Sequence, residues 1–262
     1  MDASPTAGGR RQPAIFIGHG SPMNIVADNA YTRDLEALGT ALAKPRAVLV
    51  VSAHWLTRGT FVGKDETNLT TYDFSGFPEE LYEKRYPAPG APDVAQRVVE
   101  LTGGAVRAAS RGLDHAAWAP LIRIWPEADV PVLELSLDLA APPTDHYALG
   151  RALAPLRDEG VLLMGSGNVV HNLGAVDWDE LAAPFDWALA FDAFVFEAAA
   201  ERRHQDLVDC LRHPLGRMAA PTPDHYLPLL SVLGAQQEDE PVTTLHASIQ
   251  HGSVSMRCLR VG

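Results

Sequence analysis

Cysteine is scarce in this sequence of 262 residues. Cys210 and Cys258 are its two cysteines, and neither belongs to a CxxC motif. Two cysteines are too few for a disulfide framework in a chain of this length, and isolated cysteines do not suggest zinc or redox chemistry. We therefore expect a reduced, cytoplasmic setting.

Long apolar runs and an excess of positive charge are also missing. No stretch of the sequence approaches the roughly 18 apolar residues that a membrane span requires. Lys and Arg together number 21 against 33 Asp and Glu, which gives a formal net charge of -12. Because this charge repels a phosphate backbone and an anionic lipid surface, we predict neither a nucleic-acid partner nor a membrane partner.

The chain does contain enough apolar residues for one sizeable core, at 47% hydrophobic content, and its length suits a single domain. Residues 1–12 are small and polar with Gly and Pro, so we expect a flexible N-terminal tail there. Residues 13–262 show no internal repeat or composition break, and we expect them to form one catalytic domain.

Short apolar runs alternate with stretches of helical periodicity along this domain. We expect strands at residues 14–17, 47–52, 132–137 and 161–164, and helices at residues 31–42, 93–101, 147–156 and 185–202. Residues 242–245 and 254–259 are expected to add strands at a sheet edge. This alternation predicts an α/β fold, with a central, mostly parallel sheet flanked by helices.

Histidines gather where the expected strands end. His19, His54 and His171 each follow an apolar run, and His115 and His225 lie in similar polar contexts. In open α/β folds, binding sites form at the carboxyl ends of the strands. Any one of these histidines could be structural, but the recurring context favours a shared metal site at that end of the sheet.

Five motifs allow the sequence to be compared with a known family. They are Gly-His-Gly-Ser-Pro-Met at 18–23, Ser-Ala-His-Trp at 52–55, Leu-Asp-His at 113–115, Gly-Ser-Gly-Asn-Val-Val-His-Asn at 165–172 and Pro-Asp-His-Tyr at 223–226. Their types and order resemble the class III extradiol ring-cleavage dioxygenases, in particular the 4,5-DOPA dioxygenase-like branch. The resemblance runs from about Pro13 to the C-terminus.

The resemblance implies a role for each of the five histidines. His19, His54 and His225 would be the ligands of one divalent metal ion. His171 would be the catalytic acid/base, which requires it to titrate near neutrality, and His115 would hydrogen-bond the substrate or oxygen. The partners would be O₂ and a small aromatic diol, and an oligomer remains possible.

The identity of the metal is left open by this ligand set. The wider superfamily binds Fe(II) with two histidines and a carboxylate, whereas this branch offers histidine at the third position. Three histidines also suit Zn(II), which relatives often contain. Because zinc cannot pass electrons to O₂, we expect Fe(II) in turnover and Zn(II) in isolated protein.

Two other functions are compatible with the same residues. A zinc hydrolase would use a histidine-bound metal and an activated water, and a non-catalytic metal protein would close the site with His171 as fourth ligand. Four polar residues adjoin the key histidines, namely Asp114, Asn168, Asn172 and Asp224. Each could be a hydrogen-bond partner of an imidazole ring or a turn or cap residue, and the sequence favours neither interpretation.

The aromatic stretch at residues 68–92 is expected to be irregular and to line a pocket. Within it, residues 72–78 resemble a pocket-lining segment of the family. A substrate that carries a carboxylate would call for an Arg nearby, but spacing alone nominates none.

Overall fold

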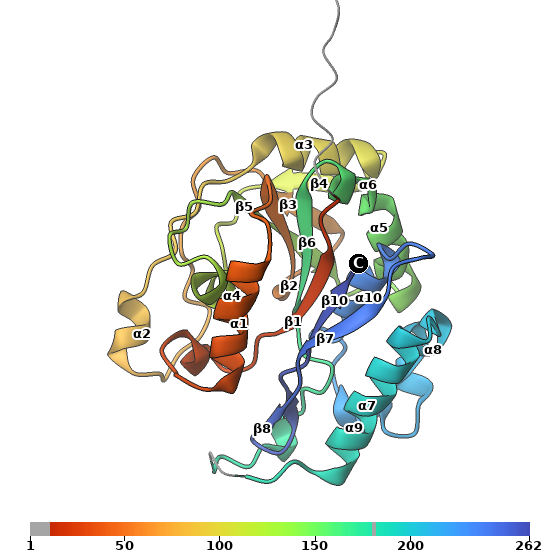
Figure 1. Ribbon diagram of the computed structural model, residues 1–262. Helices are drawn as coiled ribbons and strands as arrows, with labels where there is room; N and C mark the ends of the chain where they lie inside the picture. Colours follow the sequence, from red (N-terminus) through yellow and green to blue (C-terminus); the bar gives the residue numbers. More distant parts are fainter. Residues whose placement is uncertain (1–10, 180–181) are drawn as a thin grey trace, which may run out of the picture.

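A computed structural model describes residues 11–179 and 182–262, and its centre is an eight-stranded sheet (Figure 1). The strand order is β4-β3-β5-β2-β6-β1-β10-β7. The strands are β1 (Ala14–Gly18), β2 (Ala47–Thr57), β3 (Thr60–Gly63), β4 (Val106–Ala109), β5 (Val132–Asp138), β6 (Val161–Gly167), β7 (Val242–His246) and β10 (Cys258–Val261). A separate two-stranded sheet pairs β8 (Ile249–Gln250) with β9 (Val254–Ser255).

The middle of the large sheet is parallel, as the alternation of apolar runs and helices predicts. β5, β2, β6 and β1 pair in parallel. The C-terminal strands β10 and β7 continue the sheet in antiparallel pairing beyond β1, which confirms the strand expected at 242–245. The second expected strand, 254–259, is instead divided between β9 of the small sheet and the start of β10. β3 and β4, which the sequence did not predict, extend the opposite edge.

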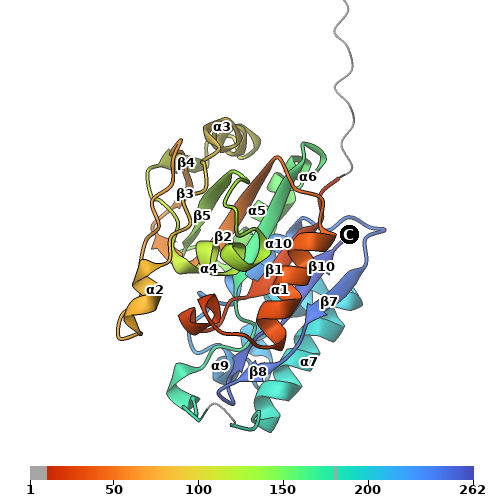
Figure 2. The same cartoon turned by 60° about the vertical axis from the view of Figure 1, so that its left-hand side comes forward.

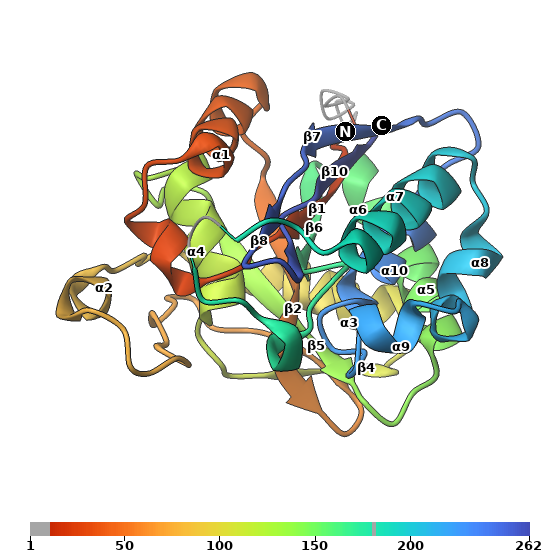
Figure 3. The same ribbon diagram turned by 90° about the horizontal axis from the view of Figure 1, so that it is seen from below.

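Helices cover both faces of the sheet (Figures 2 and 3). One face carries α1 (Ala30–Ala41) and α4 (His115–Ile124), beside the short α2 (Glu79–Glu83). The other carries α3 (Pro92–Leu101), α5 (Pro143–Leu153), α6 (Pro155–Asp158), α7 (Asp186–Ala200), α8 (His204–Val208), α9 (Gly216–Ala219) and α10 (Leu227–Gly234). Short 3-10 turns lie at Pro22–Ile25, Leu173–Ala175 and Cys210–Arg212.

The alternation of side chains along the central strands explains this arrangement. In β1, Ile15 and Ile17 pack with α1 and α4, whereas Phe16 packs toward α7 and α10. Successive side chains of a strand point to opposite faces, and a sheet that is apolar on both faces must be covered on both. α10 is buried along its whole length, between the sheet and α5.

α4 is a helix that the sequence did not predict, because Pro120 lies inside it. Proline has no N–H to donate to the carbonyl four residues earlier, which usually ends a helix. Here that carbonyl, of Ala116, instead accepts a hydrogen bond from the buried Ser166 hydroxyl at 2.6 Å. A side chain of β6 thus replaces the missing backbone donor and keeps α4 continuous.

The ends of the domain are joined by hydrogen bonds around Arg157. Residues 1–10 of the expected tail lie outside the described residues, but Gln12 is buried and exchanges hydrogen bonds with Arg157. Arg11 pairs with Asp158 at 2.6 Å. Within the described part of the chain, every helix is too short or too polar to cross a membrane.

Candidate metal centre

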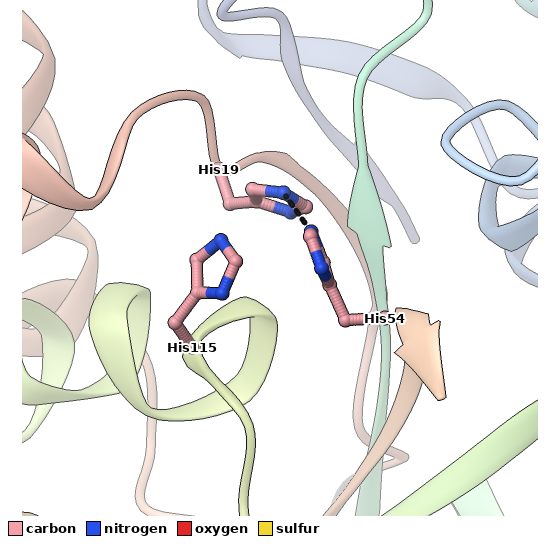
Figure 4. Close-up of side chains that lie close together, drawn as sticks. All are labelled: His19, His54 and His115. Atoms are coloured by element: carbon pink, nitrogen blue, oxygen red, sulfur yellow. Dashed lines mark hydrogen bonds between the residues drawn. The ribbon is translucent and has the colours of Figure 1, made fainter. Parts of the chain in front are cut away.

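All five predicted histidines come together at the carboxyl end of the parallel strands. His19 follows β1 directly, His115 is the first residue of α4, and His225 precedes α10. Figure 4 shows His19, His54 and His115 turned toward a common space. Since neighbouring parallel strands end at one edge of the sheet, residues far apart in the chain meet there.

His54 does not lie beyond the end of its strand, as the sequence suggested, but within β2. The pairing of β2 with β5 shifts register between Val51 and Leu56, so that the intervening residues of β2 bulge. A bulge bends a strand and redirects its side chains, and such bulges are common beside active sites. The irregularity at 52–55 therefore accompanies the turn of the His54 ring toward His19.

His54 lies at the spacing of metal ligands from two other imidazoles. The Nε2 atom of His54 lies 3.3 Å from Nε2 of His19 and 3.2 Å from Nε2 of His225. Ligands at about 2.1 Å from a tetrahedral zinc-type ion are separated by about 3.4 Å. His19, His54 and His115 also form a group of three whose ligand atoms all lie within 4.8 Å of one another, so His115 is a further candidate ligand.

The Nδ1 partners orient these nitrogens toward a cation. Ser166 donates its proton to Ala116, so its oxygen accepts from His19 Nδ1 at 3.0 Å. The Asp224 carboxylate accepts from His225 Nδ1 at 2.5 Å. An imidazole that carries its proton on Nδ1 presents a lone pair at Nε2, and burial lowers the pKa of both rings, which favours this neutral form. Such a cluster of lone pairs suits one metal ion.

Asp73 is a site residue that the sequence analysis did not identify. Its carboxylate lies 3.2 Å from His54 Nδ1 and 2.9 Å from His115 Nδ1. Although burial favours the neutral acid, hydrogen bonds from His115 and His54 hold the pKa of Asp73 well below its usual range. The available signal was its place in the aromatic segment that resembles a pocket wall.

The other neighbours of the histidines divide between the two interpretations left open by the sequence. Asp224 holds an imidazole ring, as described above. Asp114 caps α4 by accepting from the Ala116 amide and also accepts from the Ser52 hydroxyl. Asn172 caps a 3-10 turn and Asn168 donates to the Ser255 carbonyl, so these two contact the backbone around the site, whereas Asp114 contacts both backbone and side chains.

His171 stacks on His225, with ring centroids 3.6 Å apart and planes inclined by 6°. Burial, and then the neighbouring His225, lower the pKa of His171 to about 3. This value differs from the near-neutral titration expected from the sequence, since burial disfavours the charged imidazolium. His171 is therefore neutral at physiological pH, and its burial makes it a weaker base than a free imidazole.

A cavity of about 310 Å³ opens in front of the histidines. Phe74, Phe77 and Trp178 contribute aromatic walls, and all five histidines contribute to the lining. This volume is at the small end of the range for ligand pockets. Among the described residues, the lining includes no Arg or Lys, so no arginine is nominated for a substrate carboxylate.

Comparison with known proteins agrees with this geometry. The model of the family described as the catalytic LigB subunit of aromatic ring-opening dioxygenase matches residues 13–258. The chain belongs to this family, and it is an extradiol ring-cleavage dioxygenase. Within class III of these enzymes it falls in the 4,5-DOPA dioxygenase-like branch, which confirms the resemblance found in the motifs.

Individual relatives extend over nearly the whole chain. A protein named 4,5-DOPA dioxygenase extradiol from Escherichia coli is 47% identical, over 96% of this chain and 95% of the relative. One of the same name from Beta vulgaris is 39% identical, over 92% and 93%. The crystal structure of an uncharacterized protein from Escherichia coli K12 superposes with a TM-score of 0.85 at 44% identity, over 96% of this chain and 100% of that one.

Proposed function

We propose that His19, His54 and His225 bind one Fe(II) ion, and that the enzyme uses both atoms of O₂ to open a catechol-type ring beside its two hydroxyls. The observation that carries this proposal is the approach of His54 Nε2 to the Nε2 atoms of His19 and His225, at 3.3 and 3.2 Å. Zinc fits the same nitrogens, but it is redox-inert. Iron is therefore proposed for turnover, and zinc for the protein as isolated.

When bound, the iron would supply Lewis acidity toward the diol oxygens and the electron transfer that O₂ chemistry needs. The residues of the chain would supply the proton transfers. His171, neutral and facing the cavity, would accept the proton of a substrate hydroxyl and return it to oxygen as the ring opens. His115, at the start of α4, would hydrogen-bond the substrate or oxygen.

The proposed substrate is a small catechol, with DOPA-like compounds as the first candidates because the relatives from Escherichia coli and Beta vulgaris are named 4,5-DOPA dioxygenase extradiol. The aromatic walls of the cavity support a flat ring. The cavity itself supports an open coordination position, which the alternative of a closed, four-ligand storage site lacks.

The proposed setting is the cytoplasm. Cys210 and Cys258 are free and buried, and burial raises the pKa of both thiols to about 12. Neither is therefore a reactive thiolate, and two unpaired cysteines are in keeping with a reducing compartment.

Anaerobic reconstitution with Fe(II) tests the proposal. The metal-stripped protein would be loaded with Fe(II), mixed with a panel of catechols, and then exposed to O₂ in an oxygen electrode. We expect oxygen uptake together with a new visible absorbance from the ring-opened product. Protein loaded with Zn(II) should show neither oxygen uptake nor the new absorbance. Turnover of an ester or amide without oxygen uptake would instead support the zinc hydrolase.

A further inference from the structure

We propose that Asp73 is a positioning residue whose single carboxylate fixes the proton of both His54 and His115 on Nδ1, and so turns both Nε2 lone pairs into the site. The inference rests on the proposed metal-dependent function. It adds a residue that couples a metal ligand to a second pocket histidine.

The contacts of Asp73 carry the first step. One carboxylate oxygen lies 3.2 Å from His54 Nδ1, and both oxygens lie 2.9 Å from His115 Nδ1. An ionised carboxylate can only accept hydrogen bonds, so both imidazoles must donate. Each ring then carries its lone pair on Nε2, the atom that faces His19 and His225 in the case of His54.

The position of Asp73 is fixed by backbone contacts with the start of α4. Leu113 donates to the Leu69 carbonyl and accepts from the Thr71 amide, both at 2.8 Å. The Trp118 indole donates to the Thr71 carbonyl at 3.0 Å, and the His115 amide donates to Asp73 at 2.9 Å. A carboxylate held in this way needs little rearrangement to orient the two rings, which is the condition for a preorganised site.

The same segment forms the aromatic wall of the cavity. Phe74, adjacent to Asp73, lines the cavity and meets His115 edge-to-face, with ring centroids 5.5 Å apart. Phe74 and Tyr72 also pack on Trp118 of α4. The segment that contains Asp73 and Phe74 therefore contacts both the proposed metal ligand His54 and the wall against which a substrate ring would lie. A change at Asp73 is expected to affect both metal binding and turnover.

Asparagine at this position would separate the two functions of the carboxylate. Its side chain has the same shape but one acceptor oxygen, and its amide group donates. The amide would face one of the two Nδ1 atoms and force a lone pair there. That ring would then carry its proton on Nε2, so that Nε2 could neither bind a metal ion nor accept a hydrogen bond from a substrate hydroxyl.

The wild-type protein provides the first test. In the metal-free protein with ¹⁵N-labelled histidine, two-bond ¹H–¹⁵N correlation spectra distinguish the two ring tautomers. We expect His54 and His115 to carry the proton on Nδ1, with assignments from His54→Gln and His115→Gln. A proton on Nε2 of either ring would overturn the inference, without reference to any Asp73 variant.

The second test compares Asp73→Asn with Asp65→Asn. Asp65 lies in the same region, accepts from the amides of Arg111 and Gly112, and serves as a matched control for the loss of a carboxylate. Zn(II) affinity would be measured by competition with a chelating indicator. We expect Asp73→Asn to bind about 10- to 100-fold more weakly than wild type, and Asp65→Asn to bind equally well.

Outcomes on the iron enzyme separate this inference from the proposed function. With Fe(II) at saturation, kcat of Asp73→Asn should remain below wild type while that of Asp65→Asn is unchanged. Wild-type Zn(II) affinity and kcat in Asp73→Asn would overturn the positioning role even if the enzyme cleaves catechols. If wild type binds metal but consumes no O₂, the function fails, and the Zn(II) affinities and the tautomers still decide the role of Asp73.

Discussion

At the scale of single residues, the site is organised by the partners of the Nδ1 atoms. Ser166, Asp73 and Asp224 each occupy the Nδ1 side of a ring, which leaves Nε2 free. Nitrogen lone pairs that face one another at little more than 3 Å repel unless a cation lies between them. His171 differs, because it stacks on His225 through its face.

His225→Ala is expected to lose the metal. The variant removes one of three converging nitrogens, and two imidazoles alone bind a divalent ion far more weakly. After reconstitution and desalting, elemental analysis should find much less than one iron per chain, and turnover should fall with it. Stoichiometric, tightly held iron in this variant would show that the ligand set is wrong.

His171→Ala is expected to keep the metal and lose the reaction. Its ring carries a proton in the proposed mechanism, and removal of a positioned acid/base lowers turnover by about 10²-fold or more. Iron content and kcat, measured on the same preparation as the His225 variant, separate the two roles. Full activity in this variant would refute the acid/base assignment.

At the scale of elements, the site depends on two irregularities, the bulge in β2 and the proline inside α4. Ser166 of β6 connects the second of these to a proposed metal ligand, since it donates to the Ala116 carbonyl freed by Pro120 and accepts from His19. One hydroxyl thus supports both a helix and a proposed ligand, and it is fully buried.

Ser166→Ala should therefore destabilise α4 and also weaken metal binding by His19. The buried Ala116 carbonyl and His19 Nδ1 would lose their partner, and a buried polar group left unpaired costs about 1–3 kcal/mol. Urea unfolding of the metal-free variant should give a free energy of unfolding lower by that amount, and Zn(II) affinity should also fall. An unchanged unfolding midpoint would contradict this account of α4.

These irregularities also mark the limit of what the sequence predicts. The periodicity predicted β1, β2, β5 and β6 and the helices α1, α3, α5 and α7, because burial produces apolar patterns that are visible locally. α4 was missed because its compensation for Pro120 comes from a residue 46 positions later in the chain. Asp73 was missed for a related reason, since only the folded chain brings it to His54 and His115.

At the scale of the whole molecule, Arg157 joins segments from both ends of the chain. It is buried, and it donates to the carbonyls of Gln12 and Val261 and to the Glu240 carboxylate. Although burial favours the neutral acid, the Arg157 hydrogen bonds lower the pKa of Glu240. This pair therefore stabilises the ends of the sheet.

Glu240→Gln should lower the free energy of unfolding at neutral pH by about 3 kcal/mol, because it leaves the buried Arg157 charge without its partner. The folded pKa of Glu240 lies below the unfolded value of about 4.3, so its contribution is present above that pH and is lost as the pH falls through the folded pKa. Urea unfolding at several pH values should show the two proteins converging in acid. A difference that persists there would contradict this assignment.

The most direct test of the central claim is the fate of the oxygen atoms. The Fe(II) enzyme would turn over a catechol under ¹⁸O₂, with the product trapped before its aldehyde oxygen exchanges with water, and the product would be analysed by mass spectrometry. The account predicts a ring-opened product that contains two heavy oxygen atoms. A product whose new oxygen comes from water would contradict it.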